Sequence, residues 1–213
     1  MVTNFTKINF EGIAGSPISA YMDNLYDISV MAYKGNGDVE SVIKFIPIDH
    51  YEKYYWPRNI NNISKYPINY IVVEAHRNLA KVINSDYIFY PCVISSDTKP
   101  NINTVAESLA KNKSRLNVIL DIPVYSALSN LSNDYTIRKK RLPRKYRNDK
   151  ALSIERERYN YLHNTLNDVK NLKLISIDDP YDMDEMARHI RYLITTVLYS
   201  DETKSNGEYF EII

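Results

Sequence analysis

Short apolar runs rich in β-branched residues alternate with segments of helical spacing along the chain. The runs are residues 7–10, 42–48, 92–95, 117–121 and 173–177. This alternation predicts a parallel sheet whose strands are joined by crossover helices. The run NVILD ends on Asp121, as expected of a central strand that delivers a polar residue to the carboxyl edge of the sheet. We therefore expect ligands to bind at that edge.

Two segments near the end of the chain show the spacing of amphipathic helices. The first has apolar residues at positions 154, 161, 162, 166 and 169, and the second at 183, 186, 190, 193, 194, 197 and 198. Apolar residues three to four positions apart form one helix face that packs on the core. Asp182 and Glu185 have the spacing of a capping box at the start of the second helix, which predicts that Asp182 is its N-cap.

Composition and charge narrow the class of protein. A chain of 213 residues with 44% hydrophobic residues fits one domain, residues 1–213. Lys and Arg number 27 against 26 Asp and Glu, so the net charge gives no overall attraction to nucleic acid or membrane. The single cysteine, Cys92, has no zinc-site spacing with any of the four histidines. With no signal-peptide pattern and no apolar run of about eighteen residues, we expect a soluble cytoplasmic protein.

The one break in composition is a basic segment, residues 138–150. Its sequence, RKKRLPRKYRNDK, holds eight basic residues and one acid, and Pro143 interrupts any helix there. We expect an exposed loop or flap that exchanges its amide hydrogens quickly without ligand, because it has few apolar anchors.

Residues 8–19, INFEGIAGSPIS, resemble the opening of thymidylate kinases, whose first strand runs into a phosphate loop of the form FEGxDGSGKS. The matching positions are Gly12, Gly15, Ser16 and Ser19. The family's acid, loop glycine and lysine are here Ala14, Pro17 and Ile18. The resemblance implies a three-layer αβα fold with a five-stranded parallel sheet, in which the matching residues bind nucleotide and Ser19 holds Mg²⁺.

The altered positions weaken the chemistry of a phosphate loop. Such a loop binds phosphate through inward-pointing backbone N–H groups and a lysine. Pro17 has no N–H and a fixed φ, and Ile18 carries no charge. The alternative to a phosphate loop in this segment is an ordinary strand followed by a helix that starts at a proline.

Three further segments extend the resemblance over nearly the whole chain. Residues 70–77 resemble the family's helix whose arginine contacts the nucleoside monophosphate, which implies that role for Arg77, although Val73 replaces a base-stacking aromatic residue. Residues 93–98 resemble the third strand and its DR pair, so Asp97 is a nucleotide and metal ligand by resemblance, and the arginine is Thr98. Another register places residues 86–87 there. Residues 117–131 resemble LDVPxExALxR, with Tyr125 and Asn130 at the acid and arginine positions.

The basic segment falls where thymidylate kinases carry a lid, near residues 132–150. In some members the lid supplies catalytic arginines, a role that the resemblance implies for Arg138, Arg141, Arg144 and Arg147. The alternative is a solvated, mobile loop.

Three functions are compatible with these residues. The first is a thymidylate-kinase-like protein that has lost most phosphoryl transfer from ATP to dTMP and keeps a nucleotide-binding or regulatory role, with ATP and Mg²⁺ as ligands if binding is retained. The second is an active nucleoside monophosphate kinase in which lid arginines replace the lysine. The third is nucleic-acid binding by the basic segment, against which the near-zero net charge argues. The family's usual homodimer makes a dimer the expected assembly.

Overall fold

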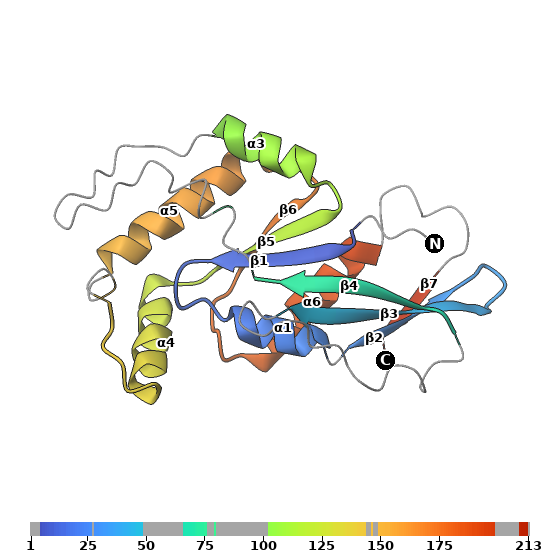
Figure 1. Cartoon of the computed structure of the whole chain (residues 1–213), viewed down its shortest axis with the longest axis horizontal. Coiled ribbons are helices and arrows are strands. Elements are labelled where there is room, and N and C mark those ends of the chain that lie inside the picture. The colour runs from blue at the N-terminus through green and yellow to red at the C-terminus, as the bar shows by residue number, and fades with distance from the viewer. Residues whose placement is uncertain are drawn as a thin grey trace.

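The computed structural model describes residues 5–26, 28–48, 66–75, 79, 102–143, 146, 149–198 and 209–212. Figure 1 shows a sheet with helices packed around it. The strands are β1 (Lys7–Gly12), β2 (Ser29–Tyr33), β3 (Val39–Ile48), β4 (Ile68–Glu74), β5 (Arg115–Asp121), β6 (Leu172–Ser176) and β7 (Tyr209–Ile212). The helices are α1 (Ile18–Tyr26), α3 (Ile102–Lys111), α4 (Val124–Ile137), α5 (Lys150–Thr165) and α6 (Met183–Leu198). No helix in these residues is long and apolar enough to cross a membrane.

The sheet is mixed and has seven strands in the order β6-β5-β1-β4-β3-β2-β7. The prediction of a five-stranded parallel sheet is therefore wrong, although the chain is an α/β protein. Strand β1 pairs in parallel with β4 and β5, β3 pairs in parallel with β4, and β6 pairs in parallel with β5. Strand β2 is antiparallel to both β3 and β7, which makes the sheet mixed.

The two antiparallel strands, both short, lie outside the predicted apolar runs. Strand β2 has five residues and β7 has four. A tight turn joins β2 to β3: the amide of Lys34 donates to the carbonyl of Asp38 at 2.8 Å, and Gly37 has φ +85°. Glycine adopts such a positive φ without strain. The hairpin lets β3 join the parallel strands while β2 extends the sheet in the opposite direction.

Residues 70–74 belong to a strand, so the helix predicted over residues 70–77 is wrong in that part. The β-branched run Ile71, Val72 and Val73 favours the extended conformation, since its side chains pack well on a pleated sheet. Strand β4 occupies the position between β1 and β3. The strand predicted over residues 92–95 and the motif of residues 93–98 lie outside the described residues.

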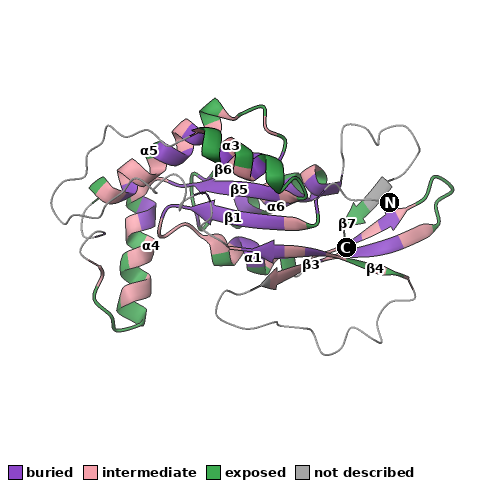
Figure 2. Cartoon of the chain, turned by 45° about the horizontal axis from the view of Figure 1, so that its top comes forward, coloured by how far each residue is buried: buried purple, intermediate pink, exposed green. Residues whose placement is uncertain are grey.

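Strand β1 separates two helical layers. Phe10 contacts Tyr21 of α1, with ring centroids 5.9 Å apart, while the neighbouring residue Glu11 accepts a hydrogen bond from Tyr159 of α5 at 3.2 Å. Successive side chains of a strand point to opposite faces, so α1 and α5 cover different faces of the sheet. Helix α6 packs beside α1. Figure 2 shows the central strands as the most buried part of the molecule.

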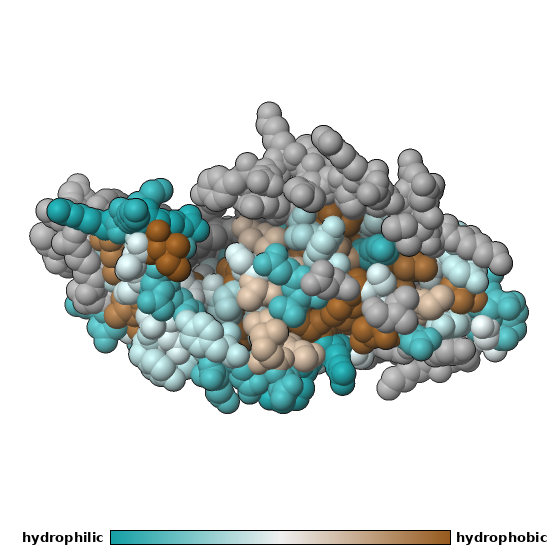
Figure 3. All heavy atoms as spheres, turned by 90° about the horizontal axis from the view of Figure 1, so that it is seen from below, coloured by the Kyte–Doolittle hydropathy of each residue, from teal (hydrophilic) through white to brown (hydrophobic). Residues whose placement is uncertain are grey.

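Helices α5 and α6 confirm the two helices predicted near the end of the chain. The Asp182 carboxylate accepts hydrogen bonds from the amides of Asp184 and Glu185, at 2.8 and 3.1 Å, which confirms it as the N-cap. Glu185 does not complete the capping box, because its carboxylate accepts from the amides of Asp178 and Asp179 instead. Seen from below, the molecule gathers hydrophobic atoms in the middle of that face and hydrophilic atoms at both ends (Figure 3).

Candidate functional site at the carboxyl edge

The segment that resembles a phosphate loop follows the carboxyl end of β1, between the parallel neighbours β4 and β5. Ligands of open α/β sheets bind at this edge, where the chain leaves a central strand for a helix. Gly12 lies opposite Leu120 of β5. A side chain at Gly12 would place its Cβ 2.5 Å from the Ser16 hydroxyl and 2.8 Å from the Leu120 carbonyl oxygen. Only glycine fits there without a shift of the loop.

A tight turn follows at residues 13–16. The amide of Ser16 donates to the carbonyl of Ile13 at 3.0 Å, and Gly15 has φ +95°. This geometry is close to a type II turn with glycine at its third position. A Cβ at Gly15 would overlap the carbonyl oxygen of Ala127 in α4. The turn therefore packs directly against helix α4.

Three donors of this loop are engaged by the protein itself. Besides the amide of Ser16, its hydroxyl donates to the Leu120 carbonyl at 3.4 Å, and the amide of Ile18 donates to the Ser16 carbonyl at 2.8 Å. Pro17 has no amide hydrogen. Ile18 is half-buried and packs against the core, and Ser19 is exposed on α1. An anion nest needs several amides that point at one ligand, so this loop as it stands is poorly arranged for phosphate.

An ion pair lies next to the loop. The guanidinium of Arg156 in α5 contacts both carboxylate oxygens of Asp121, with Nε to Oδ1 at 2.6 Å and Nη2 to Oδ2 at 2.9 Å. These hydrogen bonds raise the pKa of Arg156 above its ordinary value. The Asp121 side chain is 9% exposed and that of Arg156 34% exposed. The acid that the sequence places at this edge is thus neutralised, and Arg156, which sequence reasoning missed, ties α5 to the end of β5.

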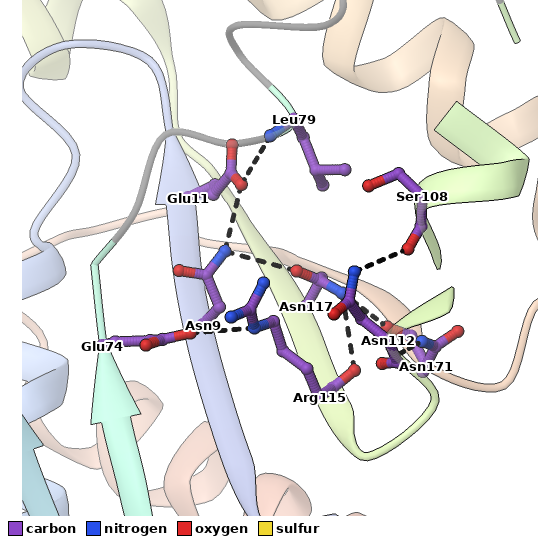
Figure 4. A network of polar contacts seen from close by, with 9 residues as sticks. All are labelled: Asn9, Glu11, Glu74, Leu79, Ser108, Asn112, Arg115, Asn117 and Asn171. Carbon is purple, nitrogen blue, oxygen red and sulfur yellow. Dashed lines mark hydrogen bonds and ion pairs between the residues drawn. The ribbon is translucent and has the colours of Figure 1, made fainter. Parts of the chain in front are cut away.

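A buried hydrogen-bond network supports the central strand on the α5 side, as Figure 4 shows for most of its members. The Asn9 amide donates to Glu11 at 3.0 Å and to the Asn117 side chain at 3.3 Å. Glu11 also accepts from the amide of Leu79 at 2.8 Å and from the Tyr159 hydroxyl at 3.2 Å. Asn9 and Glu11 are 0% exposed. The carboxylate of Glu11 therefore lies just before the loop and away from solvent.

The network continues across neighbouring strands (Figure 4). The Asn117 side chain donates to the carbonyl of Asn171 at 3.4 Å, and the Asn171 side chain donates to the carbonyl of Leu109 at 3.1 Å. Arg115 pairs with the buried Glu74, with Nε to Oε1 at 2.8 Å. The signal in the sequence was the presence of polar residues inside otherwise apolar strands. Buried polar groups need such partners, because an unpaired group costs free energy.

Two of the four predicted lid arginines can be placed. Arg138, just after α4, pairs with Asp134 at 2.8 Å on the exposed surface, and Arg141 is exposed. Asn130 of the same helix contacts the loop through the Gly15 carbonyl. At 1.5 Å per residue, Arg138 lies about 12 Å further along the helix than Asn130. Arg138 is therefore not brought to the loop.

The remaining predicted site residues, Arg77, Asp97, Arg144 and Arg147, lie outside the described residues. Of the two predicted magnesium ligands, the structure thus describes only Ser19. Within the described ranges, no three His, Cys, Asp or Glu side chains are grouped so that they could hold a metal ion. No protein-family model matches the chain, and no curated protein matches it.

Proposed function

We propose that this chain is a thymidylate-kinase-like nucleotide-binding protein in which phosphoryl transfer from ATP to dTMP is weak or lost. The observation that carries the proposal is the loop at residues 12–19. It has the place of a phosphate loop, after a central parallel strand, but its Ser16 and Ile18 amides donate to its own carbonyls. Phosphoryl transfer depends on positioning and on positive charge around the phosphates. A loop without lysine supplies little of either.

The charges around the loop support a reduced activity. Arg156 is the described cation beside it, and its guanidinium is held by Asp121. Arg138, one of the predicted lid arginines, pairs with Asp134 instead. Each 1.4 kcal/mol of lost transition-state stabilisation slows a reaction about tenfold, so the loss of several cationic contacts slows turnover by orders of magnitude. Nucleotide binding without turnover gives a regulatory or sequestering protein. Mg²⁺ enters this proposal together with ATP.

The test is binding and turnover by the purified chain. We expect calorimetry to detect weak binding of ATP or dTMP with Mg²⁺, and a coupled assay to detect little or no ADP formation from ATP and dTMP. Robust dTMP phosphorylation would favour an active kinase that uses its lid arginines. Binding of a nucleic-acid duplex that weakens steeply with salt, without nucleotide binding, would favour the basic segment as a nucleic-acid site.

We also propose that the chain forms a homodimer, which the resemblance implies. We propose separately that it is cytoplasmic, as expected from its sequence. Light scattering after size exclusion tests the first, and imaging of the tagged protein in its own cells tests the second.

A further inference from the structure

Tyr181 lies between β6 and α6. It is largely exposed, yet hydrogen bonds hold both its backbone and its side chain. Its side chain is 68% exposed, yet its hydroxyl donates a hydrogen bond to the Asn130 side chain. Its backbone amide donates to the carboxylate of Asp179 at 2.9 Å. A turn of this kind, in which an aspartate side chain accepts from the amide two residues later, fixes the backbone locally. The ring is thus held at its hydroxyl and at its backbone while most of its surface faces solvent.

The loop that carries Tyr181 is itself braced. The buried carboxylate of Glu185 accepts from the amides of Asp178 and Asp179, at 3.0 and 3.1 Å. Asp182 caps α6 immediately after Tyr181. Ordering an exposed aromatic ring costs conformational entropy. In this protein the ring is already ordered by folding, so a ligand that binds it does not lose that free energy.

Asn130 links the ring to the loop of residues 12–19. Its side-chain amide donates to the carbonyl of Gly15 at 3.0 Å, while its side-chain oxygen accepts from Tyr181. The ring is therefore one side chain away from the loop. Strand β6, which precedes Tyr181, runs parallel to β5, with Ser176 opposite Asp121. Tyr181 thus belongs to the same carboxyl edge as the candidate site.

We propose that the Tyr181 ring is a stacking platform for the planar ring of a nucleobase bound at the carboxyl edge. This inference rests on the proposed function, since it names the part of the nucleotide that Tyr181 holds. An aromatic ring with a free face stacks on any base. With a poor phosphate loop, base stacking provides binding energy that does not depend on the missing lysine.

The experiment compares a ligand that has a base with one that lacks it. ATP and inorganic tripolyphosphate, each with Mg²⁺, are titrated into the wild type, Tyr181→Leu and Tyr181→Phe. The matched control is Tyr192→Leu, which removes an exposed tyrosine of α6. At 1.5 Å per residue, Tyr192 lies about 14 Å along the helix from Met183, the first residue of α6. We expect Tyr181→Leu to bind ATP about tenfold more weakly and tripolyphosphate unchanged. Tyr181→Phe keeps the ring and should lose no more than about twofold.

The outcomes separate this inference from the proposed function. If the wild type binds ATP and Tyr181→Leu binds it equally well, the stacking role is wrong and nucleotide binding stands. If Tyr181→Leu weakens both ligands equally, Tyr181 acts by supporting the loop through Asn130, which also overturns stacking. If the wild type binds no nucleotide at all, the proposed function fails and the stacking role with it.

A second variant covers the case in which Tyr181→Leu does not fold. The chain has one tryptophan, Trp56, so Tyr181→Trp adds a fluorescent ring at the proposed site. We expect ATP, and not tripolyphosphate, to quench the added fluorescence relative to the wild type. Equal spectra with and without saturating ATP would overturn the proposal.

Discussion

The central strand β1 and the loop that follows it use their polar groups differently. In β1 the buried Asn9 and Glu11 pair with residues from other segments, among them Asn117, 108 positions away along the chain. In the loop, the backbone amides of Ser16 and Ile18 donate to carbonyls three and two residues away. The polar groups of β1 therefore link separate parts of the fold, whereas the loop amides stabilise mainly the loop. Mutations in the strand should reduce stability, and mutations in the loop should mainly change ligand binding unless they disturb its contact with α4.

The largest loss of stability is expected where the loop touches α4. Gly15→Ala combines a positive φ, which costs about 1–2 kcal/mol, with an overlap on the Ala127 carbonyl, for a total of about 3 kcal/mol. Urea unfolding measures this loss. The control is Gly37→Ala, which has φ +85° in an exposed turn and should cost only the conformational part. Equal losses at the two glycines would contradict the close packing of the loop on α4.

A loss of similar size is expected in the strand. Glu11→Leu removes an acceptor shared by the side-chain amide of Asn9, the backbone amide of Leu79 and the hydroxyl of Tyr159. Three buried donors then lose this acceptor, which costs about 3 kcal/mol. Glu11→Gln keeps a side-chain oxygen and should cost about 1 kcal/mol. If Glu11→Leu unfolds at the same urea concentration as the wild type, the buried network does not hold the strand.

The ion pair at the carboxyl edge should contribute less. Asp121→Asn breaks a two-contact pair that is only partly buried, so we expect a loss of about 1 kcal/mol. Asp134→Asn breaks the more exposed pair with Arg138 and should cost roughly a few tenths of a kcal/mol. Thermal unfolding of the two variants side by side gives the comparison. A larger effect at Asp134 would mean that the Asp121–Arg156 pair does not anchor α5.

The smallest effect concerns pH and the contact of α1 with α6. Nδ1 of His189 lies 2.7 Å from the hydroxyl of Tyr21, and burial lowers the pKa of His189. Glu185 and Asp178 oppose this shift, and Arg188 adds to it. The folded chain thus binds a proton less readily than the unfolded chain. The contribution of neutral His189 to the free energy of unfolding should be complete above about pH 6.5, the ordinary histidine pKa. It should be lost as the pH drops below that value.

Urea unfolding of the wild type and His189→Asn at about pH 7.5 and at about pH 5 tests this sign. These values lie about one unit above and about one and a half units below the ordinary histidine pKa. Burial also lowers the pKa of His163, which affects both proteins alike. The difference between the two curves therefore reports His189. A wild type that gains stability relative to the variant as the pH falls would contradict the neutral state of His189 in the fold.

Local patterns in the sequence predicted what local forces determine. β-Branched runs marked β1, β3, β5 and β6, and a 3.6-residue spacing with Asp182 marked α6. The resemblance misled at residues 70–74, where it suggested a helix although Ile71, Val72 and Val73 favour a strand. The short antiparallel strands β2 and β7 lie outside the apolar runs from which the sheet was predicted.

The sequence predicted where the candidate site lies but not the contacts between its residues. The glycines and serines at residues 12–19 marked the loop, but the hydrogen bond of the Ser16 hydroxyl depends on Leu120, 104 residues away. The same is true of the links from Asp121 to Arg156 and from Asn130 to Gly15 and Tyr181. Such contacts come from tertiary packing, which a single sequence does not reveal.

The most direct test restores the two altered loop residues, Pro17→Gly with Ile18→Lys, and measures Mg-ATP affinity by calorimetry and dTMP turnover by a coupled assay. A loop that regains an amide donor and a phosphate-pairing charge should bind Mg-ATP more tightly by about 2–4 kcal/mol, roughly 30- to 900-fold. Ile18→Lys alone should gain less, because Pro17 still lacks its amide. Turnover should stay low in every variant, since by the resemblance Thr98 replaces an arginine that binds phosphate. Equal ATP affinity before and after restoration, or robust dTMP phosphorylation by the unmodified chain, would contradict the account.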